Sequence, residues 1–283
     1  MVFLSRIFRR KFRFLQRPAK ISARHFFTPL SILAFSRFLI SLFVLSAIFF
    51  LVFKSDTFKV QSISVLFEGY GYDSESIKDR IKSAFIGKNI FWLNEGTALS
   101  ALKKEYLSIA GTRLLRNLPR RISVYVSERD PVAMLITAPS DFQSTPSAAI
   151  ELSVKEERST SQRLLVDKSG LIFYKASISG MAVLVTDEGS AILGNLLNRP
   201  LDKFMINVVS QMKTTDISAS LIIRIYGDIL VVLKDKSFVW LTPTKEVDYQ
   251  VEILKMIIEK YRIEGKGIAK IDLRFKNPVV EFK

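Results

Sequence analysis

The chain has 283 residues, of which 48% are hydrophobic and 24% are charged, and its formal net charge is +15. This length allows one large domain or two modest ones, and the composition is too apolar for an intrinsically disordered protein. Cysteine is absent and His25 is the single histidine. The sequence therefore excludes cysteine nucleophiles, disulfides and Cys/His zinc sites, together with any histidine-based triad away from His25.

An uncharged apolar run extends from Phe38 to Phe53 and reads FLISLFVLSAIFFLVF. As a helix it spans about 24 Å, slightly less than the ~30 Å hydrocarbon core of a bilayer, and the flanking Arg37 and Lys54 can extend to the two interfaces. A buried helix of a soluble protein is one alternative, but such a helix normally has a polar face. A cleaved signal peptide is another, but no Ala-x-Ala site follows the run. We therefore predict a retained transmembrane signal anchor at residues 38–54.

The positive charge is concentrated before this anchor. Residues 1–37 hold nine of the 42 basic residues and no acidic one, so the other 33 basic residues outnumber the 27 acidic residues by only six. By the positive-inside rule the tail 1–37 is cytoplasmic, and the chain is a single-pass type II membrane protein. Each basic group that lies near anionic lipid contributes about 1 kcal/mol to membrane binding. Topology alone accounts for the charge, and no nucleic-acid partner is expected.

After the anchor the patterns are those of an α+β protein. Apolar residues alternate from Ile63 to Phe67, which predicts a half-buried strand. Ser74 is predicted to cap a helix that ends at Gly87. The loop GKNIFWLN, a second short helix and two strands (Ile109–Asn117 and Arg121–Ser127) follow. The predicted order between residues 58 and 128 is β-α-α-β-β.

The second half begins with a segment of different character. Residues 138–162 are rich in serine, threonine and proline and show no sustained period, which predicts a surface loop. Beyond it, apolar alternation and amphipathic stretches predict a β-rich region with two packed helices. The predicted elements are strands at Leu164–Val166, Leu171–Tyr174, Ser220–Ile225, Ile229–Leu233, Ser237–Leu241, Gly267–Phe275 and Val279–Phe282, and helices at Leu201–Met212 and Lys245–Arg262.

Five stretches of this part occur in a characteristic order: FKVQSISVLFEG, GKNIFWLN, LPRRISVYVSERDPVAML, VDKSGLIFY and IDLRFKNP. Together they resemble the bacterial cell-division protein family FtsQ/DivIB, over residues 58–282. The segment LPRRISVYVSERDPVAML is similar to the most recognisable element of that family, and IDLRFKNP to one of its C-terminal strands. A short basic tail followed by one anchor is also the layout of this family.

The resemblance implies a POTRA domain at residues 58–128 and a β-rich domain with packed helices at residues 129–283. It implies a non-enzymatic scaffold of the divisome, in the inner membrane at the septum. Such a scaffold links FtsB/DivIC-like and FtsL-like single-pass membrane proteins and regulates the machinery for septal peptidoglycan synthesis. No cofactor or metal is expected. The POTRA module of such proteins is linked to recruitment to the division site.

The resemblance also implies where a partner binds. In this family the C-terminal β edge receives a partner segment as an added strand, a mode in which backbone groups supply affinity and side-chain pockets supply selectivity. The residues that correspond to this edge are Arg274, Phe275, Val279 and Val280. Pro278 departs from the pattern, because it removes a backbone donor and favours an edge or a turn.

For several of these residues a purely structural interpretation stands beside the functional one. The junction Glu128-Arg129-Asp130-Pro131 is interpreted as a hinge whose charges are solvated or pair locally, the alternative being a recruitment surface. For Phe91 and Trp92 we predict half-burial under the first helices, with an exposed contact patch as the alternative. Arg274 either pairs with Asp272 or a neighbouring acid, or docks the partner directly.

Two other functions remain open from the residues alone. A membrane-anchored hydrolase with a Ser–Lys dyad would need neither histidine nor cysteine. Serine and lysine are too abundant here for their presence to be evidence, and no serine lies in a G-x-S-x-G motif. A POTRA protein of envelope assembly or secretion is the other possibility, although such proteins usually carry tandem POTRA modules or a large barrel.

Overall fold

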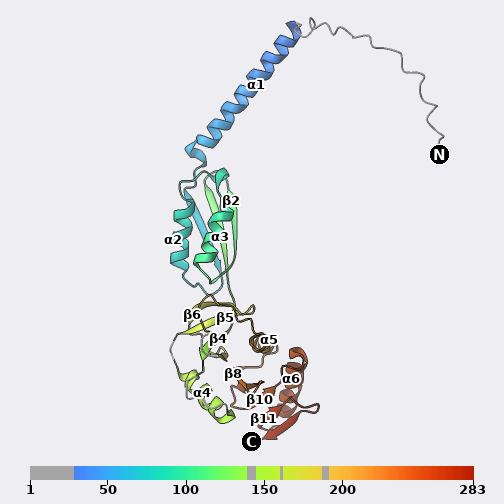
Figure 1. Cartoon of the computed structure of the whole chain (residues 1–283). Helices are drawn as coiled ribbons and strands as arrows, with labels where there is room; N and C mark the ends of the chain where they lie inside the picture. The colour runs from blue at the N-terminus through green and yellow to red at the C-terminus, as the bar shows by residue number, and fades with distance from the viewer. Residues whose placement is uncertain (1–28, 139–144, 160–161, 187–190) are drawn as a thin grey trace, which may run out of the picture. The chain divides into compact units, whose positions relative to one another are not determined.

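The computed structural model of the chain describes residues 29–138, 145–159, 162–186 and 191–283 (Figure 1). Most of the predicted basic tail and part of the predicted loop 138–162 lie outside these residues. The chain divides into two compact units after Phe58, and each unit is described here by itself.

The first unit contains one long helix, α1 (Pro29–Lys54), followed by a single 3-10 turn, η1 (Asp56–Phe58). The helix begins nine residues earlier than the predicted anchor and therefore includes Arg37. From Phe35 to Val52 it is long and apolar enough to cross a membrane. The side chains of residues 35–51 are exposed on every side of the helix, including those of Phe38, Phe43 and Leu51. A helix without a polar face in this position agrees with the predicted anchor.

The second unit begins with a three-stranded sheet and its helices, here called the N-terminal lobe (residues 59–128). In the sheet order β1-β3-β2, the central β3 is parallel to β1 and antiparallel to β2. Buried Ile77, Ile81 and Phe85 project from α2, and β3 contributes alternate buried residues to the same core. The elements are β1 (Ser62–Glu68), α2 (Ser74–Phe85), η2 (Ile90–Trp92), α3 (Glu95–Glu105), β2 (Ile109–Asn117) and β3 (Arg121–Glu128). This confirms the predicted order of strands and helices.

The remainder, here called the C-terminal lobe (residues 129–283), is built on a nine-stranded mixed sheet with the order β12-β11-β10-β9-β8-β7-β4-β5-β6. Parallel pairs join β4 to β7, β7 to β8 and β10 to β11, and the other neighbours are antiparallel. The strands are β4 (Pro131–Thr137), β5 (Arg163–Asp167), β6 (Ile172–Ala176), β7 (Val183–Thr186), β8 (Ala219–Ile225), β9 (Asp228–Leu233), β10 (Phe238–Leu241), β11 (Ile268–Asp272) and β12 (Val279–Phe282).

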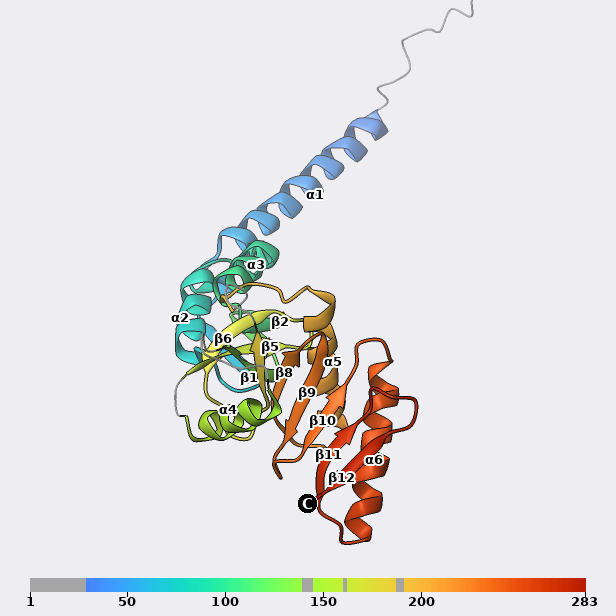
Figure 2. The same cartoon turned by 60° about the horizontal axis from the view of Figure 1, so that its bottom comes forward.

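Helices cover both faces of this sheet (Figure 2). On one face α5 (Pro200–Thr214) and α6 (Val247–Ile263) share a core with Ile222 of β8. On the other face α4 (Pro146–Arg158) contributes Ala149 and Leu152 to a second core with Leu221. Neighbouring residues of one strand thus enter opposite cores, as the period of two requires. The chain is a mixed α+β protein with a large sheet.

In the N-terminal lobe the N-cap of α2 is Asp73 and not the predicted Ser74. Three features of the C-terminal lobe also differ from the sequence prediction. The predicted loop 138–162 contains the helix α4, which Thr145 caps by accepting a hydrogen bond from the N–H of Ala148. Strand β7 was not predicted. Strand β11 ends at Asp272, whereas the prediction extended it to Phe275, because the Asp272 carboxylate accepts a hydrogen bond from the N–H of Arg274 and turns the chain there.

Candidate partner-binding edge

Strand β12 forms one edge of the nine-stranded sheet, where it pairs with β11. Just beyond it, the N–H of Lys283 donates to the carbonyl of Gly267 on the β11 side at 2.9 Å. Because backbone groups alternate in direction along a strand, the N–H groups of Val280 and Phe282 point away from β11. They form the row of outward donors that an added strand would meet.

The opposite edge of the sheet is not equivalent. The β6 residue Ile172 donates its N–H to the carbonyl of Asn195 and accepts from the N–H of Gly194, at 2.9 and 2.7 Å. Leu171 forms a further isolated bridge with Leu196. A returning segment of the same chain therefore covers the start of β6, whereas β12 lies at the uncovered end of the sheet order among the described residues.

The side chains of β12 make this edge apolar. Val280 packs against the core beneath α6, and the Phe282 ring meets the Tyr261 ring edge-on with centroids 4.8 Å apart. Val279 on the other face is 45% exposed and Phe282 is 46% exposed. A strand with exposed apolar residues and free backbone donors is suited to strand addition.

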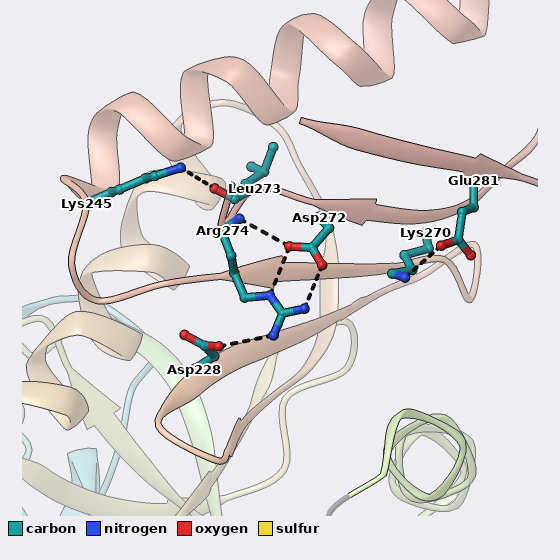
Figure 3. Close-up of polar contacts among 7 residues, drawn as sticks. All are labelled: Asp228, Lys245, Lys270, Asp272, Leu273, Arg274 and Glu281. Carbon is teal, nitrogen blue, oxygen red and sulfur yellow. Dashed lines mark hydrogen bonds and ion pairs between the residues drawn. The ribbon is translucent and has the colours of Figure 1, made fainter. Parts of the chain in front are cut away.

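The connection from β11 to β12 holds Arg274 in a fixed position (Figure 3). Its guanidinium binds both carboxylate oxygens of Asp272, at 2.9 and 2.7 Å, and reaches Asp228 at 3.1 Å. The same group lies over the ring of Trp240, 4.4 Å from its centroid. The predicted pairing of Arg274 with Asp272 is therefore confirmed, and direct docking of a partner by Arg274 stays a prediction.

Electrostatics reinforce this pair. Burial alone would raise the pKa of Asp272, but the hydrogen bonds and the charge of Arg274 hold that pKa below its ordinary value. In return, the hydrogen bonds that Arg274 donates to Asp272 and Asp228 keep the pKa of Arg274 above its ordinary value. The cation is thus fixed beside the edge and is about one-third exposed.

Phe275 follows Arg274 and is 57% exposed. Its backbone is held by Lys245, whose Nζ donates to the carbonyls of Leu273 and Phe275 at 2.7 and 2.5 Å. Lys245 itself precedes α6, and the buried amide of Gln250 accepts from the N–H of Thr242 and donates to the carbonyl of Lys245. Lys245 could not be singled out from the sequence, because the carbonyls that accept its hydrogen bonds lie almost thirty residues away.

The junction of the two lobes differs from the predicted hinge. Glu128 is only 7% exposed, and its Oε2 accepts a hydrogen bond from the N–H of Gly71 at 2.6 Å. Arg129 pairs with Asp167 at 2.6 Å, 38 residues away in sequence. The prediction of solvated or locally paired charges is therefore wrong for these two residues, and the burial of Glu128 removes it from any recruitment surface.

The prediction for the loop GKNIFWLN is corrected as well. Its buried residues are Ile90 and Leu93, whereas Trp92 is 66% exposed and Phe91 is 37% exposed. The 3-10 turn η2, capped by Asn89 accepting from the N–H of Phe91, directs Ile90 inward. Half-burial of Trp92 is therefore wrong.

Among the described residues no group of three or more histidine, aspartate or glutamate side chains is arranged to hold a metal ion. No protein-family model matches the chain, and none of the curated proteins matches it. The resemblance to FtsQ/DivIB therefore rests on the five stretches of sequence and on their order.

Proposed function

We propose that the chain is a membrane-anchored, non-enzymatic scaffold of the bacterial division machinery, of the FtsQ/DivIB type. In this proposal α1 is the anchor, the N-terminus is cytoplasmic, and both lobes lie outside the cytoplasm at the septum. The N-terminal lobe is the POTRA domain. The β-α-α-β-β order and the sheet order β1-β3-β2 support that assignment.

The observation that carries the proposal is the apolar edge strand β12. It ends the sheet, it directs the N–H groups of Val280 and Phe282 outward, and it exposes Val279, while Phe275 is exposed in the connection that precedes the strand. A single-pass partner of the FtsB/DivIC or FtsL type would add an extended segment to this edge, with backbone hydrogen bonds for affinity. Linking such partners is how the scaffold would regulate septal peptidoglycan synthesis.

The experiment is a co-purification of the full chain in detergent with the FtsB/DivIC-like and FtsL-like proteins of the same cell. Val280→Pro removes one outward N–H without removing a donor to β11, a position where an edge strand tolerates proline. Phe275→Glu places a charge on the exposed apolar surface. Each variant should weaken capture by roughly tenfold or more, because central apolar anchors and backbone hydrogen bonds dominate such interfaces.

Met256→Glu is the matched control for Phe275→Glu. Met256 is 65% exposed on α6, so the same charge is introduced on the same lobe, on a helix instead of the edge strand and its connection. Capture by this variant should equal that of the unmodified chain. Capture that persists in both edge variants, or that falls equally in Met256→Glu, would remove β12 as the binding edge.

A further inference from the structure

Large apolar side chains are exposed at one end of the N-terminal lobe. Ile86 is 51% exposed, Trp92 is 66% exposed and Leu118 is 60% exposed. They belong to two loops, one after α2 and one between β2 and β3. These three residues, with the basic residues of the same loops, are here called the tip.

Hydrogen bonds place both loops beside the first residues of the lobe. The N–H of Val60 donates to the carbonyl of Lys88 at 2.9 Å, and the N–H of Gly87 donates to the carbonyl of Val60 at 3.0 Å. The N–H of Gln61 donates to the carbonyl of Arg120 at 2.9 Å. The tip is therefore the end of the lobe at which the chain enters it.

The chain enters from the proposed membrane anchor. Only residues 55–58 separate the end of α1 at Lys54 from Lys59. Four residues span at most roughly 14 Å when fully extended. A lobe tethered this closely keeps its entry end within reach of the headgroup region, whatever the orientation of its remainder.

The charge of the tip has one sign. Residues 59–61, 86–94 and 118–121 contain four basic residues and no acidic one. Lys59, Lys88 and Arg121 are exposed. Tryptophan is enriched at membrane interfaces because its ring is apolar and its N–H is polar, and basic groups are attracted to an anionic leaflet.

We propose that the tip is a lipid-contacting surface: Ile86, Trp92 and Leu118 insert at the outer interface of the membrane, and Lys88 and Arg121 bind the headgroups of anionic phospholipids. The proposal rests on α1 being the anchor. Its consequence is that the lobe is held by two attachments, one covalent and one through lipid, which restricts its rotation about residues 55–58.

The chain's two tryptophans allow a direct test. Trp240 is 9% exposed beneath Arg274, so Trp240→Phe leaves Trp92 as the only indole reporter, and Trp92→Phe leaves Trp240. Each full-length variant is reconstituted into vesicles of phosphatidylcholine and phosphatidylglycerol, with or without bromine near the carbonyl end of the acyl chains. We expect the bromolipid to quench the emission of Trp92 and to leave that of Trp240 unchanged.

A charge-reversed pair separates the lipid contact from mere proximity to the anchor. In the Trp240→Phe background, Lys88→Glu with Arg121→Glu should reduce the quenching of Trp92. Lys103→Glu with Lys104→Glu, at the far end of α3, should not. Replacing phosphatidylglycerol by phosphatidylcholine should reproduce the loss seen with the tip variant.

The outcomes separate this inference from the function on which it rests. If the chain floats with the vesicles and Trp92 is no more quenched than Trp240, the anchor stands and the lipid-contacting tip is overturned. If the bromolipid does not quench Trp92 and its emission changes only when a partner protein is added, the lipid-contacting tip is also overturned, and the tip is assigned to a protein interface. If the chain does not float with the vesicles, the anchor and the tip both fail.

Discussion

The guanidinium of Arg129 and the carboxylate of Asp167 lie 2.6 Å apart at the junction of the two lobes. Arg129 also donates from Nε to the carbonyl of Leu107 at 2.9 Å, and the second oxygen of Asp167 accepts from the N–H groups of Ser169 and Leu171. Arg129, the first residue of the C-terminal lobe, therefore links Leu107 of the N-terminal lobe to the turn between β5 and β6. The ion pair also joins two of the stretches, LPRRISVYVSERDPVAML and VDKSGLIFY, on which the family resemblance rests.

Asp167→Asn tests the value of this contact. The amide keeps the shape of the side chain and an oxygen for Ser169, but it leaves Arg129, whose side chain is 26% exposed, without its counter-charge. We expect the free energy of unfolding to fall by about 2–3 kcal/mol, because removing one member of a largely buried pair strands the other. Denaturant unfolding of the full chain in detergent micelles, followed by tryptophan fluorescence, measures it.

The control is a second ion pair at the same junction. Lys213 and Asp130 lie 3.1 Å apart, but their side chains are 54% and 69% exposed. Lys213→Met should change the free energy of unfolding by less than about 1 kcal/mol, since water screens exposed pairs. An equal loss in the two variants would show that burial does not distinguish the two contacts.

Gly69 is a second sensitive point at the junction. Its φ is +141°, and a Cβ there would lie 2.7 Å from both the Cβ and the Oε2 of Glu128. Gly69→Ala should therefore destabilise the chain by about 2 kcal/mol or more, from backbone strain and from displacement of Glu128. Gly87→Ala is the control, because Gly87 also has a positive φ of +78° but no atom within 4 Å of the added Cβ. If thermal unfolding shows that the two variants lose equal stability, backbone strain alone explains the loss.

Glu128 gives the junction a pH dependence. Burial raises the pKa of Glu128, and the hydrogen bond from the N–H of Gly71 offsets only part of that effect. The folded state therefore binds this proton more tightly than the unfolded state, so the contribution of Glu128 to stability is greatest at low pH and declines as pH rises from the ordinary glutamate pKa through the raised one. Glu128→Gln should lose this decline. Melting temperatures of the unmodified chain and of the variant, measured across this pH range, test the prediction. Parallel curves for the two would show that Glu128 is not the source of the decline.

Sequence patterns predicted the N-terminal lobe well because its elements each bury one face. Ile77 and Ile81 mark the buried side of α2, and alternation marks β1 and β3. The short strand β7 lacks any such contrast. It lies between β4 and β8, and all four of its residues are buried. A four-residue apolar run without polar alternation does not by itself identify a strand.

Helix α4 was missed for the opposite reason. Its inward face carries few apolar residues, chiefly Ala149 and Leu152, so no helical period stands out. The signal that was present is local: Thr145 followed by Pro146 is an N-cap with proline in the first turn. The burial of Arg163, which binds Glu156 of this helix at 2.7 Å, has no local signal, because it depends on how helix and sheet pack.

The predicted C-terminal strand does form an edge of the sheet, and partner binding there stays a prediction, but the internal support of this edge could not be predicted. The position of Phe275 depends on Lys245, which donates to two carbonyls of the β11–β12 connection, and a backbone carbonyl leaves no trace in the sequence. Likewise, Arg274 meets Asp228 and Trp240 only because β9, β10 and β11 are neighbours in the sheet.

Lys245→Met should weaken partner capture at β12 while leaving the lobe folded. Methionine keeps the apolar stem but loses the two hydrogen bonds to Leu273 and Phe275. Their loss should release the connection and lower affinity by roughly tenfold, the equivalent of about 1.4 kcal/mol. Hydrogen exchange at residues 274–276 should rise in the same variant. Lys255→Met is the control, because Lys255 is exposed on α6 and its ion pair with Glu259 is long, at 3.9 Å, and therefore weak. Unchanged capture with faster exchange would show that the edge binds without a fixed connection, and that Lys245 serves the fold alone.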